Sequence, residues 1–255
     1  MTHEIFSRSA RLLGTEAMER MAHAKVIVFG VGGVGSWVAE ALVRTGFQHI
    51  TIVDSDVVAE SNINRQLMAT TLTVGQPKVA ALRTHLLTLN PAADVVAMQM
   101  AYTAATAQDF GLQDYDYIID CIDSLEHKAS LILHATQTGA KFYSSMGAAL
   151  KLDPTKIEVA EFWKVKGCPL GAALRRRFKK AGTLPKRRFR CVFSQELKSN
   201  HDLPTSAEAQ GMWDARKAQI NGSLVHITAI FGMTLAGMVV QDVAAHSSAQ
   251  THTSE

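Results

Sequence analysis

A glycine-rich loop near the N-terminus constrains the fold of this chain more than any other feature. Gly30-Val31-Gly32-Gly33-Val34-Gly35 follows an apolar stretch at Lys25–Phe29 and precedes a helical pattern at Ser36–Arg44. In such a strand–turn–helix setting, glycines let the backbone turn tightly and approach a phosphate, and the helix N-terminus offers unpaired N–H groups with a favourable dipole. The loop therefore predicts an anion site within a Rossmann-like α/β fold.

The first half of the chain alternates strand patterns with helix patterns. This alternation predicts a doubly wound, mostly parallel sheet that is covered on both faces and binds ligands at the carboxyl ends of its strands. The predicted strands are Lys25–Phe29, His49–Val53, Val95–Met100, Tyr117–Cys121 and Lys141–Ser145, and the predicted helices are Ser36–Arg44, Gln76–Leu89, Ala104–Phe110 and Leu125–Thr138.

The pattern changes after about residue 150. Three further segments follow one another with no long linker: Lys156–Val165, a helical stretch at Leu170–Lys180, and Phe189–Ser194. A chain of 255 residues can bury one good core with an elaboration. We therefore expect a nucleotide-binding core over 1–150, a C-terminal elaboration of the same globule over 151–245, and a disordered Ser/Thr/His-rich tail over 246–255.

Three charged residues indicate which nucleotide the core binds. Asp54 ends the second predicted strand, where a dinucleotide fold places the carboxylate that binds ribose hydroxyls, and this fits NAD and ATP equally. Arg65 and Lys78 add two cations near the same pocket. Because positioned cations stabilise the charge that builds on a leaving pyrophosphate, they favour a triphosphate over NAD.

Four motifs together resemble the ubiquitin-activating-enzyme-like adenylating proteins, the ThiF/MoeB family. They are Asp54-Ser55-Asp56, Asn62-Ile63-Asn64-Arg65-Gln66, Gly75-Gln76-Pro77-Lys78 and Tyr117-Ile118-Ile119-Asp120-Cys121-Ile122-Asp123. The resemblance implies ATP and Mg²⁺ as cofactors, Arg65 and Lys78 as catalytic phosphate ligands, and Asp123 as the catalytic metal ligand. Ser124 and Lys128 depart from the Asn and Arg that the family usually has there. The nucleotide-binding residues that we expect are Gly30, Gly32, Gly33, Gly35, Asp54, Asp56, Asn62, Arg65, Gln66, Lys78 and Asp120.

The resemblance also implies a homodimer. Enzymes of this family use an arginine from the N-terminal helix of the neighbouring subunit to contact the triphosphate, and Arg11 matches that position best. Arg8 is the alternative, and either residue is also explained as a solvated side chain near a terminus.

A one-sided basic segment points to a polyanionic partner. From Lys164 to Arg190 there are eleven Lys or Arg residues and no Asp or Glu. We expect this segment to bind a polyanion, with Phe178 and Phe189 stacking on exposed bases, although a solvated loop would have the same composition. The branch of the family described next implies that the polyanion is tRNA, and the predicted tRNA-binding residues are Arg175, Arg176, Arg177, Lys179, Lys180, Arg187 and Arg188.

Two features narrow the resemblance to one branch of the family. The chain lacks the Cys-x-x-Cys pairs that hold zinc in many members, and it carries the basic segment. It is similar to the branch that uses ATP to adenylate, dehydrate and cyclise the threonylcarbamoyl group on the adenosine beside a tRNA anticodon. The alternative is activation of a ubiquitin-like sulfur-carrier protein, and the resemblance leaves a cysteine desulfurase or sulfur-acceptor partner open.

The three cysteines, Cys121, Cys168 and Cys191, neither pair nor cluster, which indicates a reducing compartment. An adenylating enzyme that transfers sulfur would use Cys191 or Cys168 as a nucleophile. The apolar surroundings of Cys191 instead favour a buried structural thiol, and Cys121 is expected in the core.

An uncharged apolar stretch, Leu224–Val240, is long enough to cross a membrane. Asn221, His226 and Thr228 favour a buried helix that covers the sheet. With no signal peptide at the N-terminus, we expect a cytoplasmic protein. Membrane association through 220–241 remains the alternative.

Overall fold

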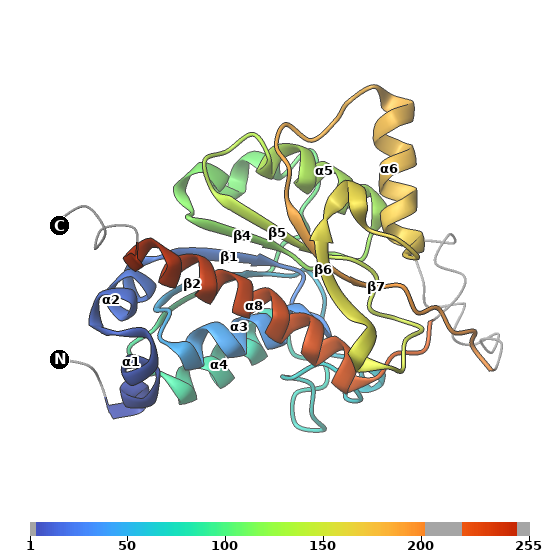
Figure 1. Ribbon diagram of the computed structural model, residues 1–255. Coiled ribbons are helices and arrows are strands. Elements are labelled where there is room, and N and C mark those ends of the chain that lie inside the picture. The colour runs from blue at the N-terminus through green and yellow to red at the C-terminus, as the bar shows by residue number, and fades with distance from the viewer. Residues whose placement is uncertain (1–3, 202–220, 249–255) are drawn as a thin grey trace.

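The computed structural model describes residues 4–201 and 221–248 (Figure 1). Its centre is a seven-stranded sheet in the order β3-β2-β1-β4-β5-β7-β6. All neighbouring strands pair in parallel except β6, which pairs antiparallel with β7 at one edge. The predicted doubly wound, mostly parallel sheet is confirmed. The strands are β1 (Lys25–Phe29), β2 (His49–Val53), β3 (Asp94–Met98), β4 (Tyr117–Asp120), β5 (Lys141–Ser145), β6 (Ile157–Glu161) and β7 (Arg190–Ser194).

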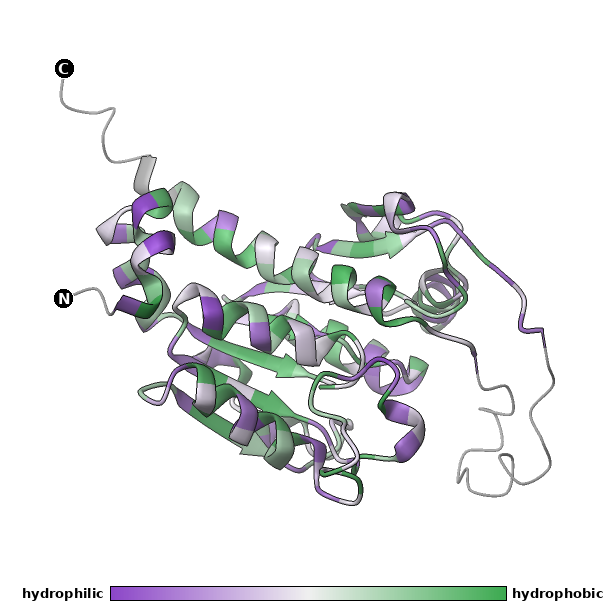
Figure 2. Cartoon of the chain, turned by 90° about the horizontal axis from the view of Figure 1, so that it is seen from below, coloured by the Kyte–Doolittle hydropathy of each residue, from purple (hydrophilic) through white to green (hydrophobic). Residues whose placement is uncertain are grey.

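Helices cover both faces of this sheet, so its strands, mostly hydrophobic in Figure 2, lie between two layers of helices. One core contains side chains of α2, α3, α4 and α8, and the other contains side chains of α5 and α6. The α-helices are α1 (Ser7–Leu13), α2 (Thr15–His23), α3 (Gly35–Thr45), α4 (Lys78–Leu89), α5 (Leu125–Ala135), α6 (Pro169–Ala181) and α8 (Val225–Ser248).

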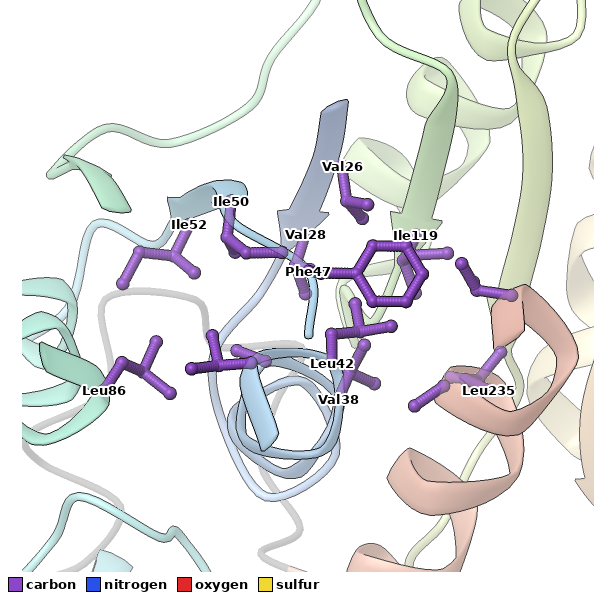
Figure 3. Close-up of a cluster of buried hydrophobic side chains, with 14 of the residues drawn as sticks. Val26, Val28, Val38, Leu42, Phe47, Ile50, Ile52, Leu86, Ile119 and Leu235 are labelled. Atoms are coloured by element: carbon purple, nitrogen blue, oxygen red, sulfur yellow. The ribbon is translucent and has the colours of Figure 1, made fainter. Parts of the chain in front are cut away.

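The two cores follow from the alternation of side chains along each strand. In β1, Val26 and Val28 face the first core, whereas Ile27 and Phe29 face the second. Figure 3 shows Val26 and Val28 beside Leu42 of α3, between the sheet and the helices. Because both faces are covered, β1 is apolar along almost its whole length, as is typical of a central parallel strand.

The structure corrects two local predictions. The helix expected at Ala104–Phe110 is only a 3₁₀ turn at Ala107–Phe110. Thr106 Oγ1 accepts the backbone N–H of Thr103 and donates to the Ala101 carbonyl, so local side-chain bonds replace the first helical turn. The predicted tail boundary at 246 also moves, since α8 continues to Ser248. Residues 249–255 lie outside the described part of the chain.

The apolar stretch near the C-terminus forms α8, which packs against α3. Of the helices in the described ranges, α8 is the one long and apolar enough to cross a membrane, and half of the apolar window within 225–245 is buried. At the crossing, a Cβ on Gly232 would lie 2.6 Å from the Val34 carbonyl oxygen, so only glycine allows this close approach. The predicted covering helix is confirmed.

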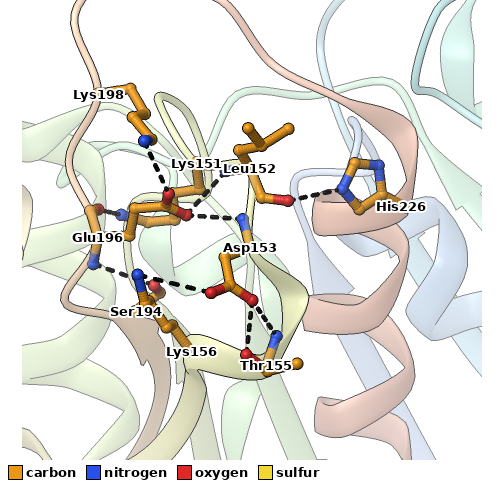
Figure 4. Close-up of polar contacts among 9 residues, drawn as sticks. All are labelled: Lys151, Leu152, Asp153, Thr155, Lys156, Ser194, Glu196, Lys198 and His226. Carbon is orange, nitrogen blue, oxygen red and sulfur yellow. Dashed lines mark hydrogen bonds and ion pairs between the residues drawn. The ribbon is translucent and has the colours of Figure 1, made fainter.

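A polar cluster joins separate segments of the elaboration after residue 150 to one another (Figure 4). Glu196, just after β7, accepts the backbone N–H groups of Leu152 and Asp153, each at 2.8 Å, and these bonds lower the pKa of its carboxyl group. His226 Nε2 lies 3.0 Å from the Leu152 carbonyl oxygen. The segments that follow β5 and β7 are thereby joined to the start of α8.

Candidate nucleotide site

The glycine loop lies at the carboxyl end of β1, where the strand order reverses between β1 and β4. This is the crevice in which open α/β sheets bind ligands. Gly30 has φ +80°, and a Cβ there would lie 2.8 Å from the Cys121 carbonyl oxygen. A Cβ on Gly35 would lie 2.1 Å from the Gly30 carbonyl oxygen. Larger residues at these two positions would open the loop and displace the first turn of α3.

Asp54 holds the loop in place from the end of β2. Its carboxylate accepts the backbone N–H of Val31 and that of Asp56, each at 2.9 Å. Lys78 is buried at the start of α4, with its ammonium 2.7 Å from Asp56 and 3.9 Å from Asp54. Burial raises the pKa of Asp54, while the Lys78 charge opposes this shift. The structure thus places Lys78, Asp54 and Asp56 together beside the loop.

Arg65 and Gln66 approach the glycine loop from the other side. The Arg65 guanidinium donates to the Ser61 carbonyl at 2.9 Å and to Asn64 Oδ1 at 2.7 Å. The stem of Arg65 lies 3.3 Å from where a Cβ on Gly33 would stand. The Gln66 amide is buried, with Nε2 3.7 Å from the corresponding position on Gly32.

Two asparagines shape the turn that carries Arg65. Asn62 Oδ1 accepts the Ala59 N–H at 3.0 Å, so in this structure Asn62 stabilises the turn. Asn64 orients the Arg65 guanidinium and donates to the Ser223 carbonyl at 3.0 Å, next to α8. Sequence reasoning did not assign a role to Asn64, although it stands beside the arginine in the motif.

Asp120 ends β4, the strand in which the sequence predicted it, but its side chain does not reach the surface. Its side chain is completely buried, 2.8 Å from the Lys128 ammonium, and it accepts the Ser144 hydroxyl at 2.7 Å. The expected contact between Asp120 and a nucleotide is therefore replaced by a contact with Lys128. Burial raises the pKa of Asp120, and the Lys128 charge opposes the shift. A carboxylate at this depth needs such a partner, because an unpaired buried charge is strongly unfavourable.

Lys128 is the residue of this site that sequence reasoning missed. Its ammonium donates to the Ile122 carbonyl at 2.9 Å, and Asp120 accepts the Ile122 N–H at 3.0 Å. The buried ion pair therefore binds both backbone polar groups of Ile122, the residue before Asp123. The sequence did offer one indication of this role, because Lys128 replaces the arginine that the family usually has at this position.

Asp123 is exposed at the carboxyl end of β4, near the mouth of the site. Burial lowers the pKa of Arg65, and the negative charge of Asp123 opposes that shift, which indicates that the two groups are close. In residues 4–201 and 221–248, no group of three His, Cys, Asp or Glu side chains could hold a metal ion. One carboxylate combined with substrate phosphates is, however, the usual way in which proteins bind Mg²⁺, so Asp123 fits this ion.

The basic segment forms part of the surface, but not every residue behaves as predicted. Arg175 donates to the Phe162 carbonyl at 3.1 Å. Arg187 bonds to the backbone carbonyls of Thr136 and Ala140, so its guanidinium is largely occupied inside the fold. Of the seven predicted residues, Arg175 is partly buried, whereas Arg176, Arg177, Lys179, Lys180, Arg187 and Arg188 are exposed, with the guanidinium of Arg187 bonded to backbone.

The two aromatic residues expected to stack on bases are unavailable. Phe178 is 1% exposed and Phe189 is 5% exposed, and both pack in the core beneath α6. The periodicity of an amphipathic helix explains Phe178, since residues three or four apart share the face that α6 turns to the sheet. The predicted stacking by these residues is wrong.

The cysteines offer no accessible thiol at the site. Cys191 lies in β7 with no exposed surface, and burial raises the pKa of its thiol well above the usual value. Cys168 is 3% exposed at the N-terminus of α6. Cys121 is half-buried and packs against the core, and burial raises the pKa of its thiol also. This favours structural roles for these residues over nucleophilic ones.

Arg11 is exposed on α1. The adjoining Phe6 and Met18 pack near Gly46, at the C-terminal end of α3, whereas the glycine loop precedes the first residue of that helix. The N-terminal helices therefore lie at the opposite end of α3, and of the strands, from the nucleotide site of the same chain (Figure 1).

Comparisons with known proteins identify the family of the chain. A "tRNA threonylcarbamoyladenosine dehydratase" of Bacillus subtilis is 36% identical over 249 residues, which cover 95% of each chain. The crystal structure of the Escherichia coli tRNA N6-threonylcarbamoyladenosine dehydratase in complex with ATP superposes with a TM-score of 0.83 at 32% identity, covering 97% of this chain and 96% of that one. A sulfur carrier protein adenylyltransferase of Thermus thermophilus is 37% identical over 112 residues, 44% of this chain and 41% of its own. Residues 6–253 match the ThiF family, and the chain belongs to that family.

Proposed function

We propose that this protein is an ATP-dependent dehydratase that acts on threonylcarbamoyladenosine in tRNA. One observation carries the proposal. The chain brings a glycine loop, Asp54, Arg65 and Lys78 together at the carboxyl ends of the central strands. It also aligns over nearly its full length with dehydratases of that name, one of which was crystallised with ATP. The sulfur-carrier adenylyltransferase aligns over less than half of the chain.

The proposed chemistry has two steps. A carboxylate oxygen of the substrate attacks the α-phosphorus of ATP, which releases pyrophosphate and leaves an acyl adenylate. A nucleophilic atom of the same modified nucleoside then attacks the acyl carbon, which expels AMP and closes the ring. The overall change on the nucleoside is the loss of one water. Because the attack is intramolecular, proximity favours it and no enzyme thiol is needed, consistent with the burial of Cys191.

The residues of the site suit the first step. The backbone N–H groups at the start of α3 and the side chains of Arg65 and Lys78 would bind the phosphates, and Asp54 would bind the ribose. Mg²⁺ would be held by Asp123 with the phosphates and would neutralise charge on the leaving pyrophosphate. Gln66, buried beneath the loop, would contact the phosphates from below. The exposed cations of α6 would bind tRNA phosphates.

The quaternary structure and location in the cell are part of the same proposal. A homodimer would let Arg11 reach the nucleotide site of the neighbouring subunit. A cytoplasmic location would supply both ATP and tRNA.

The experiment is a pyrophosphate-release assay with two candidate substrates, tRNA that carries threonylcarbamoyladenosine and a ubiquitin-like sulfur-carrier protein. A reaction without either substrate is the blank. We expect release with the modified tRNA alone, together with a nucleoside product lighter by one water in mass spectrometry. Arg65→Ala should lower turnover at least tenfold, since a charge-assisted contact contributes about 1.5–3 kcal/mol. Arg44→Ala, an exposed arginine on α3 paired with Glu40, is the matched control. Pyrophosphate release with the carrier protein but not with tRNA would contradict this proposal and support activation of a sulfur-carrier protein instead.

A further inference from the structure

The basic surface around α6 carries one exposed aromatic side chain, Trp163. It lies in the 3₁₀ turn Phe162–Lys164 that follows β6, and 36% of its surface is exposed. In Figure 1 this turn lies between the end of β6 and α6. Trp163 thus immediately precedes the basic segment, whose two phenylalanines are buried.

The turn holds the indole ring in a defined position. Trp163 packs edge-to-face against Phe162, with ring centroids 5.2 Å apart. Phe162 is completely buried and stacks on Phe189, with centroids 4.9 Å apart. The Arg175 guanidinium lies over Phe162 at 5.9 Å from its centroid. An ordered base of aromatic rings therefore supports an indole that is still open to solvent, which reduces the entropy lost when a ligand binds.

The charge around Trp163 is positive. Lys164 and Lys166 follow it in the sequence and are exposed. The acidic neighbour, Glu161, is turned inward. Its Oε2 accepts the backbone N–H of Trp163 at 3.2 Å, and its Oε1 is buried. An anionic ligand at the indole would therefore lie near cations, and the carboxylate of Glu161 would not repel it from the surface of this turn.

We propose that Trp163 stacks on an unpaired base of the RNA that this surface binds, an inference that rests on the proposed tRNA substrate. An aromatic platform flanked by cations is the usual way to bind single-stranded nucleic acid, because every base has a π-face and the cations follow the phosphates. Unpaired loop bases can be splayed out to stack on such a ring, whereas the stacked bases of a duplex cannot. Trp163 takes the role that Phe178 and Phe189 cannot fill.

The test compares two RNA probes, an anticodon stem–loop and a blunt duplex of the same stem, in salt titrations with the full chain. Trp163→Ala should weaken stem–loop binding about five- to 150-fold, the range that one stacked base supplies. Its slope of log affinity against log salt should stay unchanged, because no charge is removed. Duplex binding should not change, and Trp163→Phe should retain part of the stem–loop affinity.

A charge variant on the same surface is the matched control. Lys179→Ala with Lys180→Ala should lower the salt slope for both probes. If Trp163→Ala binds the stem–loop as tightly as wild type does, the stacking contact is wrong while the tRNA substrate stands. If wild type binds neither probe, both the RNA substrate and this contact are wrong.

Discussion

At the scale of single residues, the buried pair of Asp120 and Lys128 organises the loop that carries Asp123. Both side chains have no exposed surface, and together they bind the backbone N–H and C=O of Ile122. The cost of removing two charges from water is offset only while each remains paired. This makes the pair more sensitive to loss of one partner than to loss of both.

We therefore predict that Lys128→Met lowers the free energy of unfolding by about 3–5 kcal/mol, because it leaves the Asp120 carboxylate buried without its partner. The double variant Asp120→Asn with Lys128→Met should recover much of this loss. Urea unfolding of the wild type, both single variants and the double variant gives the coupling free energy. Additive effects of the two substitutions would contradict the role assigned to this pair.

At the scale of elements, the crossing of α8 over α3 connects the C-terminal helix to the nucleotide site. Gly232 lies against Val34 and Trp37, at the start of the helix that the glycine loop precedes. Thr228, one turn earlier on α8, lies 3.2 Å from where a Cβ on Gly33 would stand. Displacing α8 therefore displaces the loop.

A pair of glycine substitutions tests this contact. Gly232→Ala should lower the free energy of unfolding by about 1–2 kcal/mol, since the added methyl group overpacks the crossing. It should also weaken ATP binding. Gly237→Ala, on the same helix with no atom within 4 Å of the added Cβ, should instead stabilise by about 0.5–1 kcal/mol through the higher helix propensity of alanine.

Urea unfolding and calorimetric titration with ATP measure the two effects. Equal stability of the two alanine variants would show that α8 is not held closely against α3.

At the scale of the whole molecule, the position of Arg11 has a consequence for assembly. The N-terminal helices lie at the end of α3 away from the chain's own glycine loop, so Arg11 can serve a nucleotide site only in another subunit of the proposed homodimer. Such an exchange makes each site depend on two chains.

Mixed dimers distinguish this arrangement from action within one chain. Arg11→Ala and Arg65→Ala should each abolish most activity as pure homodimers. Co-expressed with separate affinity tags, they should recover about a quarter of wild-type activity, because half of the dimers then hold one intact site of two. Heterodimers isolated through both tags but without activity would exclude a role for Arg11 across the interface.

The sequence by itself determined the type of fold and predicted several of the residues that lie around the glycine loop. The alternation of apolar strands with amphipathic helices is a pattern of residues close in the sequence. The geometry of the glycine loop likewise follows from its own residues, so both can be predicted without knowledge of distant contacts. Asp54, Arg65 and Lys78 were found because they stand at fixed places next to predicted strands or turns, and the structure brings them together.

The tertiary structure alone decided which side chains are available to a ligand. Asp120 and Arg187 carry the right charge for their predicted partners, yet each is engaged inside the fold by groups that are distant in space until the chain folds. Trp163 was overlooked for the same reason, since burial of Phe178 and exposure of Trp163 depend on how α6 packs on the sheet. Residue type determines what chemistry a side chain can perform, whereas packing determines whether that side chain meets water, a ligand or another part of the protein.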